Sequence, residues 1–423
     1  VNTESLIHYK MHISKKNEVY IILSELSSSE NQELADFFTF EVPGAKFMPM
    51  YRNRMWDGKI RLFSPATGQI YVGLLSYIKN YCSRNGIQYI LENGVENEKT
   101  VEREVVSGFV KSLKPKSKGK SLRVRDYQID VVNNFLKNPQ CIQEVATGAG
   151  KTLVTAALSE RVQQFGRSIL IVPNKSLVVQ TEEDYLNMGL DVGVFYGNKR
   201  DYGKHHTICT WQILNNMMKD TKSGKAEVTI GEFLEGVVCV IVDEVHSAKA
   251  NALKTLLTGP MAKIPLRWGL TGTIPKEKFE YQSLFSSLGN VMNKVSAKEL
   301  QDKGVLAQCH VNIVQLMDHA EHSNYQSELK YLLTDDKRLD ALVDIISNAN
   351  KNGNTLVLVD RVESGKELAN RLGDGAVFVS GATKTDARKE HYDEVADVDN
   401  KIIVATYGVA AVGINIPRIF NLM

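Results

Sequence analysis

Residues 144–152 read Glu-Val-Ala-Thr-Gly-Ala-Gly-Lys-Thr, and this stretch decides the fold of the chain. It follows a short apolar segment, residues 141–145, that predicts a strand, and it opens an apolar run, residues 153–158, that predicts a helix. A glycine-rich turn between a strand and a helix can cradle a phosphate, because the loop amides and the positive helix end both face the anion. In such a cradle Lys151 would reach the outer phosphates and Thr152 would bind a magnesium ion.

The loop departs from the general phosphate-loop pattern at one position, because the first glycine of that pattern falls on Val145. The Gly-x-Gly-Lys-Thr core is intact, and an ordinary glycine turn remains the alternative interpretation of these residues alone. The expected nucleotide contacts in this loop are Thr147, Gly148, Ala149, Gly150, Lys151 and Thr152.

The length of the chain indicates a protein of more than one domain. The chain has 423 residues, of which 43% are hydrophobic and 24% charged, and its formal net charge is +2. A nearly neutral chain can bind nucleic acid only through a local basic patch. The cysteine count is 5, with no metal-ligand spacing, so we expect reduced, mostly buried thiols in a cytoplasmic protein. No apolar run is long enough to span a bilayer, and no signal peptide is apparent at the beginning of the chain.

Residues 1–110 predict a small α+β domain, with strands at 19–23 and 88–91 and an amphipathic segment at 30–38. Residues 46–63 interleave basic and aromatic side chains, a pattern that suits phosphate contacts together with stacking or groove insertion. A hairpin with a solvated basic face around an Asp57-Gly58 turn explains the same pattern equally well. The candidate DNA contacts here are Arg52, Arg54, Trp56, Lys59 and Arg61.

A basic linker at residues 111–122 separates this domain from residues 123–295, where strands and helices alternate. Continuous β-branched runs such as residues 237–242 (Val-Val-Cys-Val-Ile-Val) are typical of parallel strands buried on both faces. We therefore expect an open α/β sheet with its ligands at the carboxyl ends of the strands.

Two adjacent carboxylates follow that apolar run. Asp243 is suited to hold magnesium, partly through water, and Glu244 to orient and deprotonate an attacking water. An Asp-Glu pair after a strand is often structural, but in the same sheet as Gly-Lys-Thr it favours phosphoryl-transfer chemistry with Lys151 as a third catalytic residue.

Three segments together resemble motifs I, II and III of superfamily 2 helicases. They are residues 146–152 (Ala-Thr-Gly-Ala-Gly-Lys-Thr), 243–246 (Asp-Glu-Val-His) and 271–273 (Thr-Gly-Thr), in the order and spacing of that family. The Asp-Glu-x-His form favours translocating helicases over local RNA unwinders. The resemblance implies that ATP and magnesium are the cofactors, and that the residues coupling the nucleotide state to the motor are His246, Thr271 and Thr273.

Further segments match the same family. Residues 125–128 (Arg-Asp-Tyr-Gln) resemble its adenine-recognition element, which adds Arg125 and Gln128 to the expected ATP contacts. Residues 172–174 resemble motif Ia, and residues 210–212 resemble a later DNA-strand contact of the first lobe. The resemblance places on DNA the residues Pro173, Asn174, Thr210, Trp211 and Gln212.

Residues 296–423 resemble the second lobe of that family, with strands expected at 355–359, 377–380 and 401–406. Residues 405–415 resemble motif V, in which Thr406 would touch the DNA backbone and Gly413 and Asn415 would lie near the nucleotide. Many relatives carry aspartate where Asn415 stands. No segment resembles motif VI, whose arginines are worth about 10³ to 10⁵ in rate. We therefore expect the natural protein to continue beyond Met423, and a chain ending there to hydrolyse ATP poorly.

The likeness extends to the amino-terminal domain, where residues 47–49 (Phe-Met-Pro) and 56–62 (Trp-Asp-Gly-Lys-Ile-Arg-Leu) resemble the accessory domain of phage UvsW-type recombination and repair helicases. The expected fold is α/β, with two RecA-like parallel-sheet lobes preceded by a small α+β DNA-binding domain. The implied function is an ATP-dependent DNA helicase or translocase acting on forked or branched DNA, monomeric, without a membrane partner, in the host cytoplasm.

Other hypotheses stay open at this stage. A nucleotide-gated DNA-binding or annealing protein without strong unwinding would carry the same motifs. A nuclease-associated motor is less favoured, since no cluster of carboxylates and lysine stands out in the amino-terminal domain. An RNA helicase is possible as well, because nothing in the motor motifs reads the 2′-hydroxyl.

Overall fold

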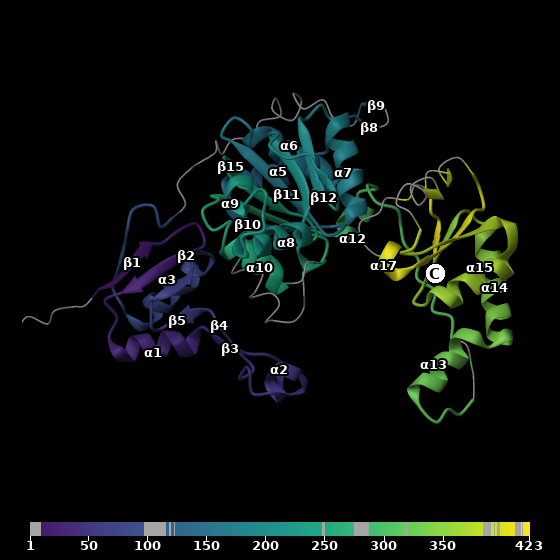
Figure 1. The fold of residues 1–423 in the computed structure, drawn as a ribbon, viewed down its shortest axis with the longest axis horizontal. Coiled ribbons are helices and arrows are strands. Elements are labelled where there is room, and N and C mark those ends of the chain that lie inside the picture. The colour runs from purple at the N-terminus through teal and green to yellow at the C-terminus, as the bar shows by residue number, and fades with distance from the viewer. Residues whose placement is uncertain are drawn as a thin grey trace, which may run out of the picture. The chain divides into compact units, whose positions relative to one another are not determined.

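The structure, a computed structural model, describes residues 10–96, 116–117, 120–121, 123–247, 250–274, 287–315, 317, 320–383, 391–392, 394–395, 398–410, 416 and 418–423. The chain divides into two compact units, Val1–Gln308 and Cys309–Met423 (Figure 1). The predicted α/β class, with two parallel-sheet lobes after a small α+β domain, is confirmed.

The amino-terminal domain is built on a five-stranded sheet in the order β5-β6-β2-β1-β7. Helix α1 (Ser28–Phe37) begins at Ser27, which forms a capping box with Glu30, and buries Leu34 against the sheet; α3 (Leu75–Asn85) buries Ile78 in the same core. Alternate residues of the strands point into that core, as expected for a half-exposed sheet. The strands are β1 (Met11–Lys15), β2 (Tyr20–Ser24), β5 (Phe63–Ser64), β6 (Gln69–Tyr71) and β7 (Tyr89–Leu91).

A separate two-stranded sheet carries the basic and aromatic segment of this domain. Strand β3 (Thr39–Glu41) pairs antiparallel with β4 (Lys59–Arg61), and the connection between them, residues 42–58, holds η1 (Ala45–Phe47) and α2 (Pro49–Arg52). The predicted hairpin around an Asp57-Gly58 turn is therefore wrong: residues 46–56 form no strand, and β4 pairs with β3 across the excursion of residues 42–58.

The first lobe contains an eight-stranded sheet in the order β13-β12-β14-β11-β15-β16-β10-β17. Its pairings are parallel except that β13 runs antiparallel to β12. Parallel pairing brings the carboxyl ends of the strands to one edge. The strands are β10 (Gln140–Val145), β11 (Arg167–Val172), β12 (Val192–Tyr196), β13 (Lys199–Arg200), β14 (His206–Thr210), β15 (Val237–Val242), β16 (Leu266–Thr271) and β17 (Asn290–Val295).

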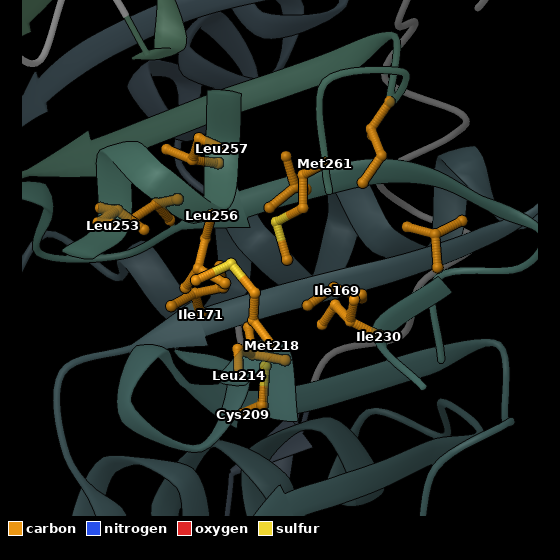
Figure 2. Close-up of a cluster of buried hydrophobic side chains, with 14 of the residues drawn as sticks. Ile169, Ile171, Cys209, Leu214, Met218, Ile230, Leu253, Leu256, Leu257 and Met261 are labelled. Atoms are coloured by element: carbon orange, nitrogen blue, oxygen red, sulfur yellow. The ribbon is translucent and has the colours of Figure 1, made fainter. Parts of the chain in front are cut away.

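Helices bury both faces of this sheet. Helix α6 (Lys151–Val162) is buried along nearly its whole length, which explains why residues 153–158 are continuously apolar. On another face, Leu214 and Met218 of α8 (Trp211–Lys222) gather with Leu256 of α10 (Ala250–Thr258) against Ile171 of β11 (Figure 2). The remaining elements of this lobe are α5 (Asp126–Lys137), α7 (Lys175–Asn187), α9 (Ile230–Phe233), η3 (Val245–Ser247) and α12 (Ala297–Asp302).

The amino-terminal domain contacts the first lobe through backbone and side-chain bonds. The amide of Glu18 donates to the carbonyl of Ala262 at 3.0 Å, and the side chain of Gln140 donates to the carbonyl of Glu18. The ammonium of Lys254, in α10, lies 5.5 Å from the ring centre of Tyr71. Helix α10 follows the Asp-Glu-Val-His segment closely, so these contacts link the domain to an element next to the acid pair.

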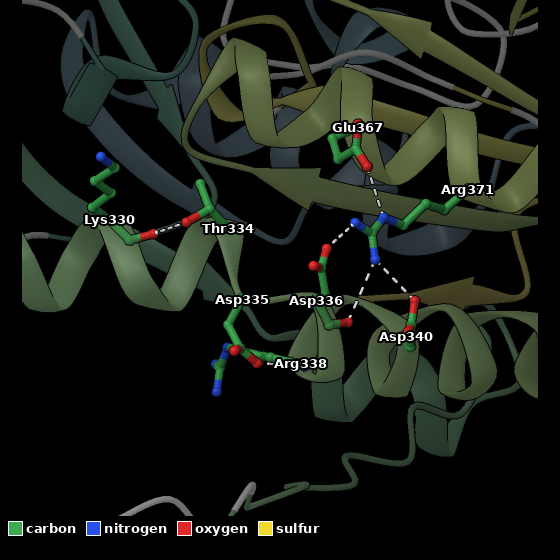
Figure 3. A network of polar contacts seen from close by, with 8 residues as sticks. All are labelled: Lys330, Thr334, Asp335, Asp336, Arg338, Asp340, Glu367 and Arg371. Carbon is green, nitrogen blue, oxygen red and sulfur yellow. Dashed lines mark hydrogen bonds and ion pairs between the residues drawn. The ribbon is translucent and has the colours of Figure 1, made fainter. Parts of the chain in front are cut away.

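The second unit is smaller. Its four-stranded sheet has the order β19-β20-β18-β21, all parallel. Figure 3 shows Arg371 of α15 (Val362–Leu372) bonded to Glu367 of its own helix and to Asp336 and Asp340 of α14 (Asp336–Asn350), which ties the two helices together. The other elements are β18 (Thr355–Val359), β19 (Ala376–Val379), β20 (Ile402–Thr406), β21 (Asn421–Leu422), α13 (Tyr325–Thr334), η4 (Gly373–Gly375) and α17 (Tyr407–Ala410).

The unit boundary lies after Gln308, so α12 belongs to the first unit, whereas the sequence predicts that the second lobe begins at residue 296. Of the predicted basic linker, the structure describes only the short antiparallel pair β8 (Lys116–Ser117) and β9 (Lys120–Ser121). The predicted buried thiols are confirmed for Cys82, Cys141, Cys209 and Cys239, whereas Cys309 is exposed. Across the described part of the chain, every helix is too short or too polar to cross a bilayer.

Candidate nucleotide site and nucleic-acid interface

The phosphate loop joins the end of β10 to the start of α6. Gly148 and Gly150 both have positive φ angles, +81° and +83°, which favour glycine over any residue with a Cβ. A Cβ on Gly150 would lie 2.4 Å from Nε2 of Gln128, so the close approach of that side chain also requires glycine. The loop thus lies where the positive end of α6 begins, a position that favours an anion.

The predicted adenine-recognition element supports this loop. The side chain of Gln128 is buried: its Oε1 accepts the amide of Arg125 at 2.9 Å and its Nε2 donates to the carbonyl of Ala149 at 3.0 Å. The hydroxyl of Tyr127 donates to the same carbonyl at 2.8 Å, while Arg125 is exposed. These contacts fix the shape of the loop, and the roles of Arg125 and Gln128 toward adenine stay predictions.

The acid pair lies beside the loop. Nζ of Lys151 is 2.7 Å from Oε1 of Glu244, and both side chains are about nine-tenths buried, with 9% of each exposed. Glu244 has a φ of 48°, an uncommon conformation for a residue other than glycine, asparagine or aspartate. Such strain persists only where the surroundings fix the backbone, and it is concentrated at functional sites.

Asp243 lies in a different electrostatic environment. Burial, followed by the neighbouring Glu244 charge, raises its pKa to about 6, against the opposing effect of Lys151. Its Oδ1 accepts the amide of Glu244 at 2.9 Å. A buried carboxyl whose ionised form is disfavoured gains from a nearby cation, so Asp243 is suited to a divalent metal ion.

The third motif closes the same site. Nδ1 of His246 is 2.7 Å from Oγ1 of Thr271, and the amide of Gly272 lies 3.4 Å from Oε2 of Glu244. Oγ1 of Thr271 also donates to the carbonyl of Thr273 at 2.7 Å. A Cβ on Gly272 would lie 2.9 Å from Oγ1 of Thr147, so motifs I, II and III meet at one place.

The described residues fit a magnesium nucleotide. The glycine loop offers amides at a helix end, Lys151 offers an ammonium, and Thr152 and Asp243 offer the hard oxygen ligands that magnesium prefers. When bound, such a complex supplies a transferable phosphoryl group. Gly413 and Asn415, the other predicted nucleotide contacts, lie outside the described residues.

The predicted DNA contacts of the first lobe follow β11 and β14, which are neighbours in the sheet. The side chain of Asn174 accepts the amide of Leu177 and caps α7, and the side chain of Gln212 donates to the carbonyl of Pro173 at 3.2 Å. Thr210 is 7% exposed and Trp211 is half-buried. The structure thus brings these two segments together, whereas Thr406, at the end of β20, belongs to the second unit.

Two lysines beside these residues are not among the predicted DNA contacts. The ammonium groups of Lys175 and Lys199 lie 5.5 and 5.7 Å from the ring centre of Tyr196, at the carboxyl end of β12. Both lysines are exposed. The available signal was the run Tyr-Gly-Asn-Lys-Arg at residues 196–200, directly after the apolar residues Val194 and Phe195.

The predicted contacts of the amino-terminal domain divide into two groups. Arg52 and Arg54 are exposed. Trp56 is half-buried and donates to the carbonyl of Lys59 at 2.8 Å, and the Arg61 guanidinium pairs with Asp57. That arginine holds the pKa of Asp57 at about 2. Trp56 and Arg61 therefore have structural partners within the domain, which composition alone did not reveal.

Comparison with family models divides the chain in the same way. A model described as "DNA helicase UvsW, N-terminal" matches residues 10–92, and one described as "Type III restriction enzyme, res subunit" matches residues 121–276. The first covers the amino-terminal domain and the second covers most of the first lobe.

The similarity to individual proteins extends over longer parts of the chain. The chain is 25% identical to the ATP-dependent DNA helicase uvsW of Enterobacteria phage T4 over 98% of its own length and 83% of that protein. A putative DNA 3'-5' helicase Rad25 of Haloarcula marismortui is 24% identical over 64% of this chain, which spans less than half (43%) of that protein. The crystal structure of T4 UvsW matches with a TM-score of 0.58 and 21% identity, over 98% of this chain and 83% of that one, and this likeness concerns the fold.

Proposed function

Because this chain belongs to the superfamily 2 helicases and carries a UvsW-type amino-terminal domain, we propose that it is an ATP-dependent DNA helicase that acts on forked or branched DNA. The observation that carries the proposal is the meeting of Lys151, Glu244 and Thr271 at one edge of the sheet. Parallel pairing of neighbouring strands brings the three segments to one edge, but the sheet does not require the buried pair of Lys151 with Glu244 or the positive φ of Glu244. Strain and buried charge of this kind are concentrated at functional sites and support one shared ligand.

The chain's residues divide the work of hydrolysis. Lys151 and the loop amides hold the phosphates, and Thr152 and Asp243 hold magnesium. Glu244 orients water and accepts its proton once Lys151 has turned from its carboxylate to the phosphates. Nδ1 of His246 lies 3.5 Å from Oε2 of Glu244 and 2.7 Å from Oγ1 of Thr271, so His246 passes a change at Glu244 on to Thr271 at the end of β16.

DNA lies along the carboxyl ends of β11, β14 and β12 in this proposal. Lys175 and Lys199 contribute phosphate contacts there, in addition to the polar groups of Asn174 and Gln212. The amino-terminal domain supplies a second DNA surface through Arg52 and Arg54. We further propose a monomer that works in the cytoplasm of a phage-infected host, as the similarity to a phage T4 protein suggests.

The nuclease hypothesis gains nothing from the restriction-enzyme family model, because that match covers motor residues only. Within the described residues, no group of three or more His, Cys, Asp and Glu side chains is placed to hold a metal ion.

The decisive experiment compares ATP hydrolysis and strand separation on a fork, a four-way junction, blunt duplex DNA and an RNA fork. We expect branched DNA to raise the ATPase rate most and to be unwound, and Lys151→Ala to abolish both activities. Hydrolysis that is indifferent to every nucleic acid would refute the proposal. Nucleotide-dependent DNA binding or annealing without unwinding would establish the gated DNA-binding protein instead.

A further inference from the structure

The excursion between β3 and β4 exposes large apolar side chains. Every residue from position 46 to position 55 is exposed. Phe47 and Met55 each expose 74% of their surface, Met50 exposes 56% and Tyr51 exposes 41%. We call Phe47, Met50, Tyr51 and Met55 the apolar tip. Figure 1 shows α2, which holds two of them, projecting from the rest of the amino-terminal domain. An exposed apolar cluster of this kind marks an interaction site.

The charges around the apolar tip indicate its partner. Lys46, Arg52 and Arg54 are exposed among the apolar side chains, and no acidic residue occurs between Glu41 and Asp57. In the part of the chain that the structure describes, no ion pair involves any of these three cations. Nζ of Lys46 lies 5.2 Å from the ring centre of Phe47. Apolar and aromatic groups surrounded by uncompensated cations fit a polyanion with flat apolar faces, which is the chemistry of nucleic acid.

The base of the excursion is held firmly. Trp56 donates to the carbonyl of Lys59, Arg61 pairs with Asp57, and the amide of Val42 donates to the carbonyl of Gly58 at 2.8 Å. Gly58 has a φ of +80°, and a Cβ there would lie 3.0 Å from Cβ of Ala45 and 3.1 Å from the ring of Tyr51. These contacts hold the excursion against its own strands, so the apolar tip has a fixed base from which to act.

We propose that the apolar tip inserts between bases at the branch point of a DNA junction, while Lys46, Arg52 and Arg54 bind the phosphates on either side. Apolar side chains that enter a base step unstack it, and a branch point needs the least unstacking because its base stack is already interrupted. The inference rests on the proposed function and adds to it the element that recognises the branch. Trp56 and Arg61 are positioning residues of this element.

The test uses the full chain and the variant Phe47→Ser/Met50→Ser/Met55→Ser, whose three side chains are exposed and so contribute little to the core. A fork with 2-aminopurine at the branch reports unstacking by a rise in fluorescence, and anisotropy gives affinities for the fork and for linear duplex of equal length. Tyr77→Ser, at an exposed aromatic residue of α3 in the same domain, is the matched control.

We expect the wild type and the control to raise the 2-aminopurine fluorescence and the triple variant not to. The triple variant should lose about tenfold in fork affinity, the effect of one or two stacking contacts, with unchanged duplex affinity and unchanged ATPase rate without DNA. The variant Arg52→Glu/Arg54→Glu should instead weaken fork and duplex binding alike and reduce the salt dependence of both.

Equal fluorescence and equal fork preference in the triple variant and the wild type would overturn the inference, even if the wild type unwinds forks. A triple variant that differs only in self-association, measured by light scattering, would overturn it too and assign the apolar tip to a second copy of the chain. A wild type whose ATPase ignores DNA would instead refute the proposed function.

Discussion

The ammonium of Lys151 lies 2.7 Å from the carboxylate of Glu244, so the lysine expected to bind phosphate and the acid expected to activate water neutralise each other. Both groups are largely withdrawn from solvent, where an unpaired charge would be costly. Nucleotide phosphates can replace the carboxylate as the partner of Lys151, and Glu244 is then released for catalysis.

This relationship predicts opposite effects of Glu244→Gln on binding and on hydrolysis. Removing the carboxylate charge frees Lys151, so a fluorescent ATP analogue should bind at least as tightly as to the wild type. The ATPase rate should fall by about 10² to 10⁴, the usual contribution of a general base. Glu144→Gln is a suitable control, because Glu144 pairs with Lys294 at 2.9 Å in the same sheet and is not placed in the site. Analogue binding as weak as in Lys151→Ala would contradict the ion-pair exchange.

Because His246 bonds to Thr271, we expect a change at this pair to reduce DNA unwinding more than ATP hydrolysis. Thr271→Val keeps the shape but removes the hydroxyl, so strand separation should fall several-fold more than the ATPase rate. His246→Ala combined with Thr271→Val should be no worse than the stronger single change, because contacting residues are not additive. The control is Thr334→Val, whose hydroxyl donates to the carbonyl of Lys330 in its own helix (Figure 3). Additive losses would show that the two residues act independently.

The buried Arg267 is expected to contribute strongly to the free energy of unfolding, although it is not part of the nucleotide site. Its guanidinium is fully buried and donates to the carbonyls of Leu257, Met261 and Ser287, and burial lowers its pKa to about 10. Arg267→Met leaves those carbonyls without donors, so we expect a loss of about 3 kcal/mol in the free energy of unfolding. Urea denaturation measures this loss.

The matched control for Arg267 is Arg167→Met, which removes the same kind of bonds to carbonyls at a partly exposed position. Water can replace some of those bonds, so its loss should be smaller. Equal denaturation midpoints for Arg267→Met and the wild type would mean that Arg267 is dispensable.

His206 predicts that the first lobe loses stability in mild acid. Burial lowers its pKa from 6.5 to about 4, and its Nδ1 is 2.9 Å from the hydroxyl of Ser168. Between these values the unfolded chain binds a proton that the folded chain does not, so the free energy of unfolding falls as pH drops through this window, by at most about 3 kcal/mol.

Urea denaturation at pH 7 and pH 5 tests this prediction. His206→Asn should show a smaller fall than the wild type, whatever its absolute stability. His205→Asn removes the exposed neighbouring histidine, whose charge adds a smaller effect to that of burial on the pKa of His206, so it should reduce the pH dependence less than His206→Asn does. A slope that is the same in all three proteins would exclude His206 as the source.

The sequence by itself determined the motor architecture. The six consecutive apolar residues 237–242, five of them β-branched, are typical of a parallel strand buried on both faces, and the structure places β15 there. The glycine loop before α6 and the acid pair after β15 can each be recognised from a few adjacent residues, without knowledge of the rest of the fold.

Only the tertiary structure shows which polar side chains already have a bonding partner within the protein. The sequence predicts the same DNA-binding role for Trp56, Arg61, Arg52 and Arg54. Composition cannot show that Trp56 and Arg61 bond to neighbouring residues of the domain while Arg52 and Arg54 are exposed. The ion pair of Lys151 with Glu244 and the contact of Lys175 and Lys199 with Tyr196 join residues from separate strands and loops. Strand order and register set those distances, and both depend on packing across the whole sheet rather than on any local pattern.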